Sequence, residues 1–115
     1  MIDIDANFYD TLLELHEERG QLKEQQVYYS KGLAVIEKEQ MRLADDDYRV
    51  KAQSKSGLSV QIQTRDARSS EPYKRAIKRL GAVEHRLAVV EGKLDIMDKK
   101  YNQSRTLEAS RRSYG

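Results

Sequence analysis

Lysine and arginine side chains are concentrated in the middle of this 115-residue chain, where their charge could bind phosphate groups. Residues 49–79 hold nine basic side chains against two acidic ones, a local charge of +7, whereas residues 1–48 carry −7. A field segregated in this way attracts polyanions to one region and repels them from another. Basic side chains bind phosphates through charge and counterion release without requiring a particular fold. The candidate nucleic-acid contacts are therefore Arg49, Lys51, Lys55, Arg65, Arg68, Lys74, Arg75, Lys78 and Arg79.

Other residue combinations give no indication of catalysis. The chain has no cysteine, which excludes a disulfide framework and a thiolate nucleophile or metal ligand. His16 and Glu17 begin an H-E-x-x-H pattern, but Gly20 stands where the second histidine is needed. The aspartates of residues 45–47 would point in different directions on a helix, which favours a solvated acidic face over a cation site. We therefore expect no enzymatic activity, no metal site and no cofactor.

Two long helical segments joined by a basic middle are predicted to position these residues, because the chain has one proline and 35% charged side chains. From Phe8 to Val50, alternate steps of four and three residues reach apolar side chains at nine of thirteen positions. This period predicts a helix over residues 7–53 that packs against other helices. Gly20 and Gly32 lie inside it and mark points where the helix could bend, break or approach a neighbour closely.

The strongest apolar stripe lies in the second predicted helix, residues 71–103. Ser69 or Ser70 is placed to cap this helix, and Pro72 is tolerated in its first turn. The four-three alternation runs through the helix without a polar interruption. Tyr73, Ile77, Val89 and Ile96 widen the face beyond a two-stranded seam. Such a face favours at least two neighbouring helices, so we predict a multi-chain helical bundle or barrel. The residues assigned to oligomerisation are Leu80, Val83, Leu87, Val90, Leu94, Met97 and Tyr101.

The basic stretch between the two helices, residues 54–70, has a different pattern. Leu58, Val60 and Ile62 alternate with polar residues, which predicts a short strand or an extended loop. A lone strand would need a hairpin mate, a neighbouring subunit or a ligand to order it, and a mobile segment is the equal alternative. Residues 104–115 are polar and basic and are predicted to fray as a tail. We therefore predict a single all-α domain in which a basic extended or hairpin-like middle joins two long helical segments.

The sequence gives no sign of membrane insertion or export. No apolar run approaches the roughly 18 to 20 residues of a membrane span. The first residues also lack the positively charged start of a signal peptide. We expect a soluble, cytoplasmic protein with no membrane partner.

Several strings, taken in their order along the chain, resemble phage recombination mediators of the UvsY type. The strings are YSKGL at residues 29–33, KEQMR at 38–42, YRVKA at 48–52 before Gly57, and GKLD at 92–95 before Lys99 and Lys100. The segment Leu58–Thr64 departs from the family pattern.

The resemblance implies an all-helical, ring-forming homo-oligomer that binds single-stranded DNA. It also implies that the protein helps a RecA-like recombinase to displace single-strand-binding protein and to begin its filament. By matching position, the resemblance implies that Arg49 and Lys51 contact DNA.

A coiled-coil structural or adaptor protein, such as a phage assembly or scaffold component, is the alternative. In that case the basic stretch contacts an acidic partner protein or the acidic first helix of a neighbouring subunit. The two functions differ in one structural respect. Either the basic side chains line an accessible groove, or they lie opposite Glu37, Glu39 and residues 45–47 of another chain.

Overall fold

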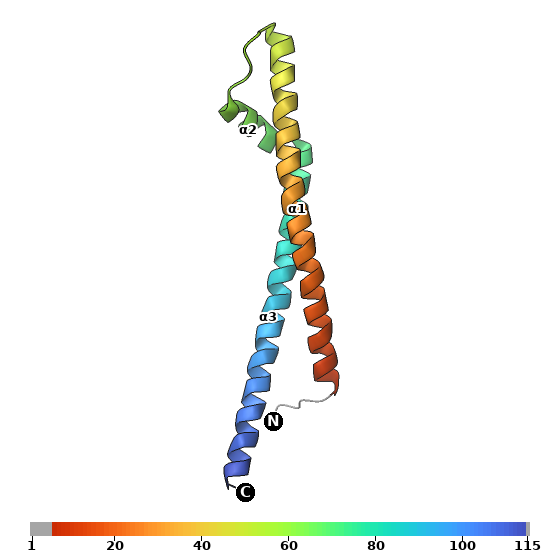
Figure 1. Cartoon of the computed structure of the whole chain (residues 1–115), viewed down its shortest axis with the longest axis vertical. Coiled ribbons are helices and arrows are strands. Elements are labelled where there is room, and N and C mark those ends of the chain that lie inside the picture. The colour runs from red at the N-terminus through yellow and green to blue at the C-terminus, as the bar shows by residue number, and fades with distance from the viewer. Residues whose placement is uncertain (1–5, 115) are drawn as a thin grey trace. The chain divides into compact units, whose positions relative to one another are not determined.

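Helices account for nearly all of residues 6–114, the part of the chain that the computed structural model describes (Figure 1). The three helices are α1 (Ala6–Ala52), α2 (Val60–Arg68) and α3 (Glu71–Tyr114). No strand occurs within residues 6–114, so the predicted all-α class with two long helical segments is confirmed. Helix α1 is continuous through Gly20 and Gly32, where a break was one of the predicted alternatives.

The helices form two compact units. The first unit combines residues 1–24 with residues 84–115, and the second comprises residues 25–83. Helices α1 and α3 therefore contribute to both units, whereas α2 belongs to the second.

In the first unit, the two helical segments run antiparallel around a small apolar core. Leu15, Leu87 and Val90 are buried there, and Val90 is fully inaccessible to solvent. Ion pairs flank this core, since Arg86 Nε donates to Glu18 at 2.6 Å. This hydrogen bond holds the pKa of the Glu18 carboxyl below its ordinary value.

The apolar stripe of α3 faces inward as its spacing predicts. Val83, Leu87 and Val90 are buried, whereas Leu80, Leu94, Met97 and Tyr101 are half-buried. Two residues that were expected to widen the stripe point outward instead, with Ile77 45% and Ile96 55% exposed. The stripe thus packs within the chain, and its contact with further chains stays a prediction.

The predicted register of α1 holds only as far as Gln40. Beyond that point Leu43 and Val50 are exposed, and Met41 and Asp45 are half-buried in their place. A straight α-helix drifts by about 20° per heptad against a strict 3.5-residue repeat, so a new set of positions turns inward. Here the inward-facing residues meet α2, whose Thr64 hydroxyl lies 3.9 Å from Met41 Sδ.

The strand or extended loop predicted for Leu58–Thr64 is wrong, because α2 covers most of that segment. Ser59 begins the helix in an extended conformation, and its hydroxyl accepts a hydrogen bond from the Ile62 N–H. The side chain of Gln63 also donates to the carbonyl of Leu58 at 2.6 Å. A five-residue alternation is too short to identify a strand, and no strand elsewhere in residues 6–114 could pair with it.

The two ends of α3 differ in how well they were predicted. Ser70 caps the first turn, because its hydroxyl accepts from the Tyr73 N–H at 3.4 Å. The predicted fraying of residues 104–115 is not seen over 104–114, since α3 continues to Tyr114, and Gly115 lies outside the described residues. No glycine or proline interrupts residues 104–114, and hydroxyl groups such as Thr106 bond back to carbonyls one turn earlier. None of the helices in residues 6–114 has a stretch long and apolar enough to cross a membrane.

Helix α1 is followed by a non-glycine residue with left-handed backbone geometry. Gln53 has φ of 49°, and its N–H donates to the carbonyl of Val50. The next N–H, of Ser54, donates to the carbonyl of Arg49 at 3.2 Å. These two hydrogen bonds form a Schellman motif, in which glycine is the preferred residue at the left-handed position.

Replacing Gln53 with glycine should therefore stabilise the chain by about 0.5 to 1 kcal/mol, because glycine adopts positive φ without the steric cost of a Cβ. The free energy of unfolding, measured by urea titration and circular dichroism, checks this expectation. Gln53→Ala is the matched control, since alanine keeps the Cβ, and it should give no such gain. A destabilised Gln53→Gly variant would show that the glutamine side chain contributes more than the backbone strain costs.

Candidate nucleic-acid interface

The structure places all nine predicted basic residues in the second unit, and all nine are exposed. Two lie in the last turn of α1, one in the following loop, two on α2 and four in the first turns of α3. The nine predicted residues therefore share one part of the fold. The residues differ in whether an acidic side chain of the same chain already holds them.

Acidic side chains of the same chain pair with four of the nine. The N–O distances are 3.1 Å for Arg49–Asp45, 3.1 Å for Lys51–Asp47, 3.4 Å for Arg65–Asp66 and 3.5 Å for Arg68–Glu37. Three of these acids belong to α1, the helix that the adaptor alternative placed opposite the basic stretch of a neighbouring copy. Neutralisation by α1 therefore occurs within one chain.

Arg49 stabilises the loop that leaves α1. Its Nε donates to Asp45 at 3.1 Å, and its Nη1 donates to the carbonyl of Lys55 at 3.3 Å. The other carboxylate oxygen of Asp45 accepts from the N–H of Leu58 at 2.7 Å. Gly57 passes so close to this pair that an added Cβ would lie 2.6 Å from Arg49 Nη2. The structure thus gives Arg49 a structural role, and its contact with DNA stays a prediction.

The first three turns of α3 carry Lys74, Arg75, Lys78 and Arg79. Within residues 6–114, no acidic side chain forms an ion pair with any of these four. They form two rows at a spacing of four residues, so the side chains within each row are neighbours on the helix surface. Four unpaired charges on one short, exposed stretch are available to an external anion.

A shallow groove runs beside these basic residues in the second unit. Its lining combines cations with apolar side chains, namely Arg68, Glu71, Tyr73, Lys74, Arg75, Ile77 and Lys78. Tyr73 is only 8% exposed, so it packs in the core and does not offer its ring to a base. Ile77, at 45% exposed, supplies the accessible apolar surface. Tyr48, the other tyrosine near the basic stretch, lines a separate hollow at the end of α1 with Lys51.

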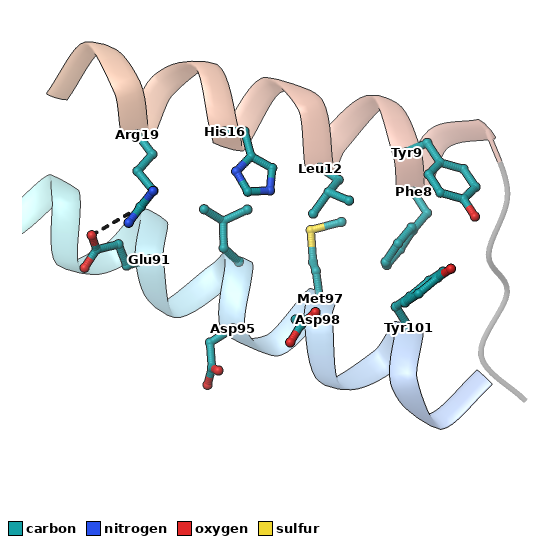
Figure 2. A pocket seen from close by; sticks show the side chains of 11 residues that line it. Phe8, Tyr9, Leu12, His16, Arg19, Glu91, Asp95, Met97, Asp98 and Tyr101 are labelled. Atoms are coloured by element: carbon teal, nitrogen blue, oxygen red, sulfur yellow. Dashed lines mark hydrogen bonds and ion pairs between the residues drawn. The ribbon is translucent and has the colours of Figure 1, made fainter. Parts of the chain in front are cut away.

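A different kind of groove, of about 590 Å³, lies in the first unit (Figure 2). Apolar side chains form most of its lining, and Phe8 and Tyr101 face each other at one end. The ion pair between Arg19 and Glu91, at 3.3 Å, lies at the other end. The remaining lining residues are Tyr9, Leu12, His16, Leu94, Asp95, Met97 and Asp98. The predicted registers contain most of the apolar members, but spacing alone did not indicate the carboxylates of α3 beside them.

His16 lines this groove and is exposed, with no metal-binding partners assembled around it. Across residues 6–114, no group of three or more histidine, aspartate or glutamate side chains is arranged to hold a metal ion.

Comparisons of the chain with protein families, with characterised proteins and with solved structures find no match.

Proposed function

We propose that the chain binds single-stranded DNA without sequence specificity through the exposed face at the start of α3. The observation that carries this proposal is the set of four basic side chains, Lys74, Arg75, Lys78 and Arg79, that no acid of residues 6–114 neutralises. Such side chains contact the phosphate backbone, which carries no sequence information. Ile77 lies among them and can contact a sugar or base.

The wider role that we propose is that of a recombination mediator without enzymatic activity, acting in the cytoplasm of a phage-infected host. The resemblance to UvsY-type mediators supports loading of a RecA-like recombinase onto DNA covered by single-strand-binding protein. It also supports assembly into a ring-like homo-oligomer, which would repeat the basic face around one surface and add weak contacts through effective concentration. A solution mass equal to one 13.3 kDa chain would contradict the multi-chain part of this proposal.

Fluorescence anisotropy of labelled oligo-dT, titrated with the pure protein at two salt concentrations, tests the binding step. Four phosphate contacts at a slope of about −0.7 each predict that affinity falls about fifty-fold between about 50 and 200 mM salt. A parallel titration with oligo-U separates a preference for DNA from binding of single strands in general. Binding that is indifferent to salt would contradict phosphate contact as its basis.

A structural adaptor is the second candidate, and the groove of the first unit favours it. Apolar side chains such as Leu12, Leu94 and Met97, bordered by acidic ones, form a surface that suits a protein partner better than a polyanion. If oligo-dT does not bind even at low salt, the basic face of α3 is a protein contact and the adaptor function replaces the mediator.

A further inference from the structure

The carboxylate of Glu37 pairs with an arginine that lines the groove beside the basic face of α3. One of its oxygens lies 3.5 Å from Nη2 of Arg68. Arg68 lines that groove together with Lys74 and Lys78. The Glu37 side chain, on α1, is 24% exposed, whereas the Arg68 side chain is 60% exposed. One guanidinium of the groove beside the proposed phosphate-binding face is therefore already held by a carboxylate.

We propose that Glu37 is an internal competitor, which occupies Arg68 until a nucleic-acid phosphate displaces it; this inference rests on the proposed function. Carboxylate and phosphate oxygens both accept hydrogen bonds from the same guanidinium fork, so they compete for one site. An ion pair with an exposed partner is weak, and unpaired lysines nearby attract the competing polyanion. Glu37 therefore lowers the affinity of the interface without blocking it.

This competition has a signature in the salt dependence of binding. Each basic side chain that neutralises a phosphate of a single strand contributes about −0.7 to the slope of log affinity against log salt. Arg68 contributes nothing to that slope while it remains paired with Glu37. Removing the charge of Glu37 frees Arg68 as an additional phosphate contact. Both the affinity and the steepness of its salt dependence should then rise.

The experiment compares Glu37→Gln with Glu39→Gln in the oligo-dT titration. Both variants lose one negative charge from α1, two residues apart, and both keep side-chain volume. Glu39 is the matched control because it accepts from Arg42 at 2.7 Å, a hydrogen bond that lowers the pKa of its carboxyl. Arg42 does not line the groove. Glu37→Gln should bind oligo-dT about two- to fivefold more tightly, with a slope steeper by about 0.7, whereas Glu39→Gln should match the wild type.

The Arg68→Ala substitution completes the test. It should cancel the gain in the Glu37→Gln background and should have little effect in the wild type, where Arg68 is already neutralised. Equal gains in the two glutamine variants would overturn the inference, because net charge alone would then explain them. A gain that survives Arg68→Ala, or no gain while the wild type binds, would also overturn it. No binding by any variant would contradict the proposed function as well, so the two failures are distinguishable.

Discussion

Replacing Lys74 and Lys78 with alanine is expected to weaken binding of oligo-dT about fifty-fold at about 50 mM salt and about tenfold at about 200 mM. Each lysine is exposed and lacks an acidic partner within residues 6–114, so each is free to neutralise a phosphate. Losing two contacts should also reduce the slope of log affinity against log salt by about 1.4. Fluorescence anisotropy at several salt concentrations measures both quantities. Alanine is a strong helix former, so α3 should keep its helical content.

Lys93→Ala with Lys100→Ala is the matched control for this substitution. These two lysines are also exposed and lie on α3, but they belong to the first unit. Removing them lowers the net charge by the same amount. An equal loss of affinity in both double variants would show that diffuse charge, and not the face at the start of α3, binds the strand.

Replacing Gly20, Gly81 and Gly92 together with alanine should stabilise the chain by about 3 kcal/mol, since glycine inside a helix costs about 1 kcal/mol relative to alanine. Nothing lies within 4 Å of a Cβ added at any of the three positions. None of the three added methyl groups would contact another residue, so the three sites share no partner and their effects should add. For a chain of this length, the melting temperature should rise by about 10 °C. Thermal unfolding followed by circular dichroism measures the change.

Gly57→Ala is the contrasting substitution, and it should lower the melting temperature. Its Cβ would lie 2.6 Å from both Arg49 Nη2 and Asp45 Oδ1 and would force this hydrogen-bonded pair apart. If the triple variant were less stable than the wild type, or lost an assembly that the wild type forms, another helix would have to approach the glycine backbone closely. The predicted multi-chain bundle would then have a defined contact.

The helical core was predictable because apolar residues buried on one face of a helix recur every three or four positions in the sequence. Val83, Leu87 and Val90 fall on the predicted stripe and are buried. The register of α1 was predictable only while one neighbour determined which face turned inward. Beyond Gln40, contact with α2 and the drift of a straight helix select Met41 and Asp45 instead, which a fixed heptad pattern does not contain.

Helix α2 and the ion pairs were missed for a different physical reason. Val60 and Ile62 alternate with polar residues, yet both are exposed on a helix whose start depends on the hydroxyl of Ser59. In this segment, one hydrogen-bonded helix cap favours the helix more than the short alternation of apolar and polar residues favours a strand. Likewise, counting charges located the basic stretch but could not show that Glu37 reaches Arg68, because that pairing depends on how α1 and α2 pack.

The hydrogen bonds of Asp45 also have a consequence for the order in which the chain folds. Asp45 and Leu58 are 13 residues apart in sequence, whereas Glu18 and Arg86 are separated by 68. The entropy lost on closing a loop grows with its length, and contacts between nearby residues form faster. We therefore expect the turn between α1 and α2 to nucleate folding of the chain. The apolar groove of the first unit, which depends on the most distant contacts, would be completed last.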